Sequence, residues 1–231
     1  MSTERKVAII TGTLFIVATA ASLIGSSLSG PILGAPDSLS QIYANGTRVT
    51  LGALLTFLAA AASASIAISL YPVLKKYGEG LALGAVAFRL IEGVFYIVDA
   101  ICLVALIPLS QQLVGSGSPD AASLQTISQS LLTLRDLAGF VFAVIAFCLG
   151  ASLYYYVFFQ SRLIPRWLSI SGFIALTLLL AAVFITLFDG APFAIAGNLT
   201  LLAAPIALQE MVLAVWLIVK GFNPSARVAR V

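Results

Sequence analysis

One apolar segment, long enough to cross a bilayer, contains an arginine and two carboxylates. Arg89, Glu92, Tyr96 and Asp99 follow one another at i, i+3, i+7 and i+10 within residues 81–107, so on a helix they share one stripe. At about 1.5 Å rise per residue the stripe climbs roughly 15 Å, half of a hydrocarbon core. Charges at such depth are costly, so they face the interior of a helix bundle and need partners there.

The composition identifies the class of protein to which this segment belongs. Of 231 residues, 61% are hydrophobic and 9% charged, and the mean hydropathy is +1.09. A soluble domain carries about 25% charged residues. We therefore expect an all-α, polytopic transmembrane helix bundle that forms a single domain over residues 1–231.

Hydropathy predicts six spans, separated by short polar or Pro/Gly-rich loops. The first is expected to end at Gly30-Pro31, and residues 108–120 are expected to form a loop. Residues 121–159 are too long for one simple crossing, so we divide them into an amphipathic interfacial segment, about 121–133, and a span. The predicted spans are about 7–28, 47–71, 81–107, 134–159, 167–188 and 199–220. In the first span, Gly12, Gly25, Thr11, Thr19, Ser22 and Ser26 suit close helix packing.

The basic residues predict the orientation. Nine of the twelve flank one face of a six-span topology, which the positive-inside rule assigns to the cytoplasm together with both termini. These nine are Arg5, Lys6, Lys75, Lys76, Arg162, Arg166, Lys220, Arg227 and Arg230. The net charge of +3 therefore reflects membrane topology, and we expect no nucleic-acid partner.

The three remaining arginines and the intramembrane carboxylates form two predicted clusters. By depth, Arg89, Glu92 and Glu210 should meet near the centre of the membrane. Asp99, Arg135 and Asp136, with Arg48 as a further candidate, should lie nearer the outer side. The candidate ligand-binding residues are Arg89, Glu92, Glu210, Tyr96, Asp99, Arg135, Asp136 and Gln209.

Counting these charges suggests proton exchange. Four carboxylates face three arginines, and if Arg48 stays at the surface, two carboxylates lack a cation. We therefore expect Glu92 or Glu210 to be neutral at rest and able to exchange a proton.

Metal chemistry has little support in the sequence. There is no histidine, the commonest metal ligand and general base. Cys102 and Cys148 lie in apolar segments at no metal or redox spacing. We predict no metal site, and the sequence identifies neither a cofactor nor a catalytic residue.

Three stretches carry a resemblance to a known family. They are Ala87-Phe88-Arg89-Leu90-Ile91-Glu92, then Ser161-Arg162-Leu163-Ile164-Pro165-Arg166-Trp167, and Glu210-Met211 with Trp216-Leu217-Ile218-Val219-Lys220-Gly221-Phe222. The chain resembles, over nearly its whole length, a bacterial polytopic membrane family catalogued as a domain of unknown function, number 4386. The resemblance implies an integral membrane protein with no assigned activity, which we expect in the bacterial cytoplasmic (cell) membrane.

Three functions fit these features. The first is binding or transport of a small molecule, lipid or proton, with Arg89 engaging an anionic group and membrane lipids, a small amphiphile or a proton as partners. The second is an intramembrane enzyme acting on a lipid, with Glu92, Asp99 or Asp136 as general acid or base and a carboxylate-held divalent cation. The third is a structural or partner-binding role in which the charges only fasten helices. Whether the protein is an enzyme, and its oligomeric state, stay open.

Overall fold

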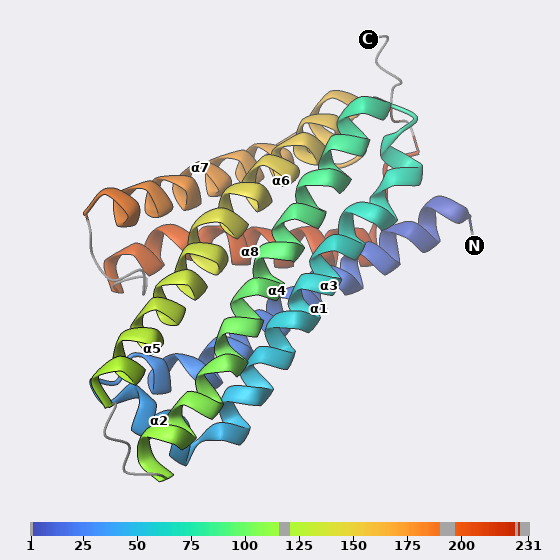
Figure 1. Cartoon of the computed structure of the whole chain (residues 1–231). Helices are drawn as coiled ribbons and strands as arrows, with labels where there is room; N and C mark the ends of the chain where they lie inside the picture. The colour runs from blue at the N-terminus through green and yellow to red at the C-terminus, as the bar shows by residue number, and fades with distance from the viewer. Residues whose placement is uncertain (1, 116–120, 190–196, 225, 227–231) are drawn as a thin grey trace.

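A computed structural model describes residues 2–115, 121–189, 197–224 and 226, and Figure 1 shows the chain. The regular secondary structure of the described residues is helical. They are α1 (Thr3–Leu33), α2 (Ser38–Ala44), α3 (Gly46–Leu74), α4 (Glu79–Gly115), α5 (Ala121–Asp136), the π-helical segment η1 (Leu137–Phe142), α6 (Ala143–Ser161), α7 (Arg166–Asp189) and α8 (Gly197–Val219).

Six helices in the described ranges are long and apolar enough to cross a membrane, as predicted. The fourth of them runs unbroken over 41 residues, Ala121–Ser161, through α5, η1 and α6. The predicted interfacial segment and the span after it are therefore parts of one continuous helix. The predicted loop between the last two spans lies largely outside the described residues.

Prolines do not end the helices where the sequence predicted. Pro31 lies inside α1, which continues to Leu33, and Pro108 lies inside α4, which continues to Gly115. Each proline removes one backbone hydrogen bond, but a membrane helix retains its form because leaving the helix would expose many more unpaired backbone groups. The predictions that Gly30-Pro31 ends the first helix and that a loop begins at Pro108 are wrong.

The six long helices pack as a closed ring. The order of contact is α1, α3, α4, α6, α7, α8 and again α1, while α2 lies against α4 and α1. In Figure 1, α3 and α4 lie side by side, whereas α7 and α8 are steeply inclined to them. The first and last helices are therefore neighbours, and the ring surrounds a common interior.

Three contacts define one end of the ring, here called the basic end. Lys76 pairs with Glu4 at 2.9 Å, Arg5 donates to the carbonyl of Leu217 at 3.1 Å, and the amide of Asn223 donates to Leu163 at 2.8 Å. The hydrogen bond to the carboxylate of Glu4 raises the pKa of Lys76 above its ordinary value.

The basic residues of the predicted cytoplasmic face gather at this end. Seven are described, in or beside the terminal turns that meet there, and Arg227 and Arg230 lie outside the described residues. The start of α1 and the end of α8 are at the same end (Figure 1).

The interior is filled towards the basic end. Tyr154, Tyr155, Phe158 and Phe15 are fully buried there and form one core with aliphatic side chains from all six long helices. A smaller apolar cluster joins α1, α2, α3 and α4 at the opposite end, here called the distal end. Between the two clusters the ring holds a cavity.

Candidate functional site

The cavity has a volume of about 260 Å³ and every long helix contributes to its wall. Its polar lining is Thr19, Ser22, Ser26, Ser29, Thr56, Ser63, Arg89, Glu92, Tyr96, Asp99, Arg135 and Glu210. Apolar side chains, among them Phe140, Phe147, Leu179 and Ile206, complete it. Polar groups that converge on a cavity between apolar side chains are typical of a small-molecule site.

An ion pair lies deep in the cavity. Arg89 Nη1 is 2.9 Å from Glu92 Oε2, and the two side chains are only 2% and 3% exposed. Ser63 of α3 donates to the other oxygen of Glu92 at 2.8 Å. The Arg89 guanidinium lies 4.6 Å from the ring centre of Phe147 and 5.9 Å from that of Tyr154. The arginine is therefore held by a carboxylate and by aromatic faces.

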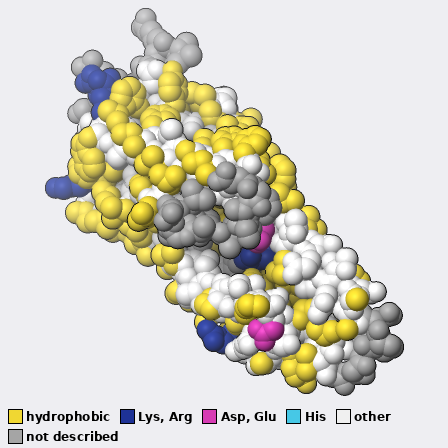
Figure 2. Space-filling model, turned by 90° about the vertical axis from the view of Figure 1, so that its left-hand side faces the viewer, with side chains coloured by type: hydrophobic (Ala, Val, Ile, Leu, Met, Phe, Trp, Pro, Cys, Tyr) yellow, Lys and Arg dark blue, Asp and Glu magenta, His cyan; other side chains and the backbone are white. Residues whose placement is uncertain are grey.

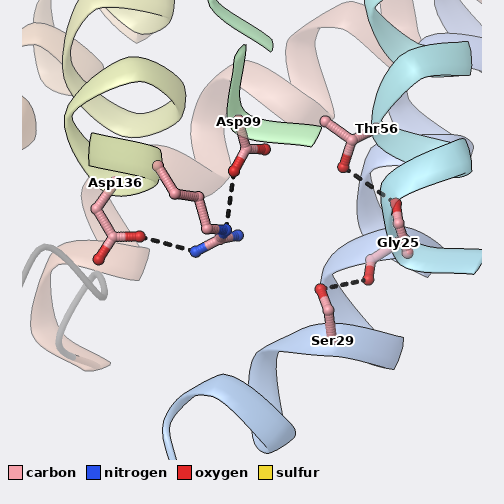
Figure 3. Close-up of polar contacts among 7 residues, drawn as sticks. Gly25, Ser29, Thr56, Asp99 and Asp136 are labelled. Carbon is pink, nitrogen blue, oxygen red and sulfur yellow. Dashed lines mark hydrogen bonds and ion pairs between the residues drawn. The ribbon is translucent and has the colours of Figure 1, made fainter. Parts of the chain in front are cut away.

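A second charged group lies further towards the distal end (Figure 3). Arg135 of α5 contacts Asp99 of α4 at 2.8 Å and its own neighbour Asp136 at 2.7 Å. The side chains of Arg135 and Asp136 are 14% and 21% exposed, against 2–3% for the deep pair. This group is thus the more accessible part of the site.

The π-helical segment η1 begins directly after Arg135 and Asp136. A Cβ at Gly139 would lie 3.2 Å from Asp99 Cγ, so only a glycine gives the carboxylate this much room. A π-helical turn places an extra residue in the helix and is frequent at functional sites. Here it lies where the fourth span packs against Asp99 of α4.

Glu210 of α8 is the third carboxylate of the cavity. Its Oε1 is buried and has no hydrogen-bond partner among the described residues, while the hydroxyl of Thr19 faces the same carboxylate. No ion pair links it to an arginine in the described part of the chain, although Arg89 is near enough to interact electrostatically. It is the least satisfied carboxylate of the site.

A stripe of hydroxyl groups on α1 forms another part of the wall. Thr19, Ser22, Ser26 and Ser29 line the cavity at i, i+3, i+7 and i+10, the same spacing as the charged stripe on α4. The sequence predicted helix packing, and not cavity lining, for Thr19, Ser22 and Ser26. The shared spacing was the signal that could have identified them as lining residues.

The structure brings together six of the eight candidate residues. Arg89, Glu92, Tyr96, Asp99, Arg135 and Glu210 line the cavity. Asp136 does not line the cavity, but it forms an ion pair with Arg135, which does. Gln209 lies elsewhere: it accepts from Tyr155 and donates to the carbonyl of Leu168 at 3.0 Å, joining α8 to α6 and α7.

Arg48, proposed as an additional member of the distal group, is exposed in the first turn of α3 and is absent from the cavity wall. The sequence did not identify Ser63 and Phe147, which hold the deep pair.

One face of the molecule is hollowed. Figure 2 shows basic and acidic side chains recessed in this hollow. Within the described ranges, no three His, Cys, Asp or Glu side chains gather as a metal site. The polar groups of the cavity wall can receive a small ligand through hydrogen bonds and charge.

Comparison with known proteins gives a family and no activity. A family model described as "Domain of unknown function (DUF4386)" matches residues 10–221. No curated protein and no solved structure matches the chain.

Proposed function

This chain belongs to the family described as a domain of unknown function (DUF4386), and from its cavity we propose that it binds a small organic cation and carries it across the membrane. The observation that supports the proposal is the buried Oε1 of Glu210, without a partner in the described part of the chain. In this proposal the protein lies in the bacterial cytoplasmic membrane with its basic end inside.

The charge balance of the cavity favours a cation. Its wall holds three carboxylates, Glu92, Asp99 and Glu210, and two arginines. Arg89 is paired with Glu92, and Arg135 is shared by Asp99 and Asp136. The carboxylate of Glu210 is the one without a paired arginine. In a water-poor cavity it is stable with a proton or with an ammonium group beside it.

An anionic ligand has less support. Arg89 was expected to engage an anion. Its Nη1 is committed to Glu92 and aromatic rings lie against the guanidinium, although its buried Nε has no hydrogen-bond partner among the described residues. An anion at the Nη1 of Arg89 would have to displace the Glu92 carboxylate from a buried pair, which costs several kcal/mol. We therefore assign ligand binding to Glu210 and a positioning role to the deep pair.

Fastening of helices accounts for only part of the polar groups. Arg135 holds α5 against α4, and Ser63 holds α3 against Glu92. Glu210 has no such bond to a neighbouring helix through Oε1. A role in ligand or proton binding explains this carboxylate, and exchange between proton and cation would couple transport to a proton gradient.

The test is a thermal unfolding experiment in detergent with simple probes. We expect methylammonium or tetramethylammonium to raise the Tm of the native protein, and acetate not to, because a ligand bound only to the folded state stabilises it. Glu210→Gln should weaken binding by at least about tenfold, the equivalent of 1.4 kcal/mol. The stabilisation should also fall at lower pH, where protons compete for the carboxylate.

Glu79→Gln is the matched control, because Glu79 is an exposed carboxylate outside the cavity wall. It should retain the full ammonium effect. An unchanged ammonium effect in Glu210→Gln, or stabilisation by acetate alone, would overturn the proposal.

A further inference from the structure

A second pocket, of about 590 Å³, lies at the basic end between the α6–α7 turn and the residues after α8. Its lining contains three cations, Arg162, Arg166 and Lys220, and no carboxylate. In the described ranges none of the three takes part in an ion pair. Among the described residues, the pocket therefore presents a concentrated positive charge that no carboxylate neutralises.

The frame of this pocket is well defined. Leu163 and Ile164 are 1% exposed and anchor the turn in the core. The amide of Asn223 donates to the carbonyl of Leu163 at 2.8 Å, joining the residues after α8 to this turn. Arg162 adopts a left-handed conformation with φ of 58°, a conformation that residues other than glycine adopt at a cost. The exposed Arg162 side chain thus extends from a backbone in the left-handed conformation, next to a residue held by a hydrogen bond.

Two further features add positive potential. Arg166 is the first residue of α7, so the positive end of a 24-residue helix dipole lies in the pocket wall. At the end of α8, whose carbonyls carry the opposite partial charge, Arg5 donates to Leu217 and Ile218. This arrangement favours an anion with several acceptor oxygens, as in a phosphate group.

The position of the pocket indicates a lipid as the source of that phosphate. Trp216 lines it and stands at right angles to Trp167, with ring centres 6.4 Å apart. Paired tryptophans at the ends of apolar helices mark the membrane–water interface. The pocket is therefore at the depth of lipid headgroups, where basic pockets between membrane helices bind anionic lipids.

We propose that the pocket formed by Arg162, Arg166 and Lys220 binds the phosphate headgroup of an anionic phospholipid. The guanidinium of Arg162 offers a planar pair of donors for phosphate oxygens, and Lys220 offers a mobile point charge from the end of α8. Leu163, Ile164, Phe222 and Trp216 supply the apolar wall. A lipid held here would join the α6–α7 turn to the end of α8.

The chain contains two tryptophans, both beside this pocket, which gives a direct readout. The full chain would be placed in phosphatidylcholine vesicles with a fixed fraction of either phosphatidylglycerol or phosphatidylcholine carrying bromine near the headgroup end of the acyl chains. Bromine quenches tryptophan fluorescence on contact. We expect brominated phosphatidylglycerol to quench several-fold more strongly than brominated phosphatidylcholine.

A matched pair of triple variants separates a site from general attraction to a basic surface. R162Q/R166Q/K220Q should lose the preference, so that both brominated lipids quench equally. K6Q/K75Q/K76Q removes the same charge from the same end outside the pocket and should keep it. An equal loss in both triple variants, or no preference in the native protein, would overturn the proposal.

Two additions guard the conclusion. If R162Q/R166Q/K220Q does not fold, the single variant K220Q should still show a reduced preference, and an unchanged preference in K220Q would contradict the proposal. Inorganic phosphate is added in a parallel series, with sodium chloride at the same ionic strength as reference. If phosphate lowers the preference and chloride does not, the pocket recognises the phosphate group, as proposed. If chloride lowers the preference equally, the lipid is held only by general attraction to a basic surface and the proposal is wrong.

Discussion

Replacing Arg89 with methionine is expected to lower the free energy of unfolding by about 3–5 kcal/mol, because it leaves the buried carboxylate of Glu92 without its cation. The two side chains are 2.9 Å apart and almost completely buried, so water cannot take over the role of the arginine. Methionine retains much of the packing of the arginine stem. The decrease in the free energy of unfolding therefore measures the effect of removing the positive charge. It is measured by equilibrium unfolding in mixed detergent micelles.

The double variant Arg89→Met/Glu92→Met provides the internal check. With both charges removed, most of the lost stability should return, because replacing a buried pair by apolar side chains is often neutral. Arg48→Met is the matched control for losing an arginine, since Arg48 is exposed, and should change stability by no more than about 0.5 kcal/mol. A double variant as unstable as the single one would contradict this account of the deep pair.

The contact between α1 and α8, which closes the ring, is the second place where a substitution is expected to change stability strongly. A Cβ at Gly12 of α1 would lie 2.7 Å from the carbonyl oxygen of Ala214 in α8, a backbone atom that cannot rotate away. Gly12→Ala should therefore force α1 and α8 apart and cost about 1–3 kcal/mol, the usual range for overpacking. Thermal unfolding measures the difference.

Gly30→Ala is the natural comparison, because it lies in the same helix and a Cβ there meets no atom within 4 Å. It should be neutral or stabilising by up to about 1 kcal/mol, through helix propensity alone. Should the two alanine variants prove equally stable, the close approach of α1 and α8 would not be what closes the ring.

The charges of the site were predictable because the cost of burying them restricts where they can point. Arg89, Glu92 and Asp99 share a stripe with helical spacing, and that stripe could only face the interior. The same logic placed Glu210 at a similar depth. Number and approximate position of the long helices followed equally from hydropathy.

The contacts within the site were less predictable. Gln209 and Glu210 are neighbours in the chain, but adjacent helical residues point about 100° apart. Gln209 bonds to α6 and α7 while Glu210 faces the cavity. Which of the two would face inward depends on the order of helices around the ring, and no pattern in the sequence gives that order. The π-helical segment was not predicted from the sequence either.

The deep ion pair also bears on how the chain enters the membrane during synthesis. Arg89 and Glu92 belong to one helix and are three positions apart in the chain, so each charge has its counter-ion before any other helix is present. Inserted alone, a charged residue at the centre of a helix costs about 2.5–3.5 kcal/mol at the translocon. An internally neutralised pair reduces that cost for α4. Glu210 is carried by α8, the last of the six long helices to be synthesised, so the cavity is completed only after α8 has been inserted.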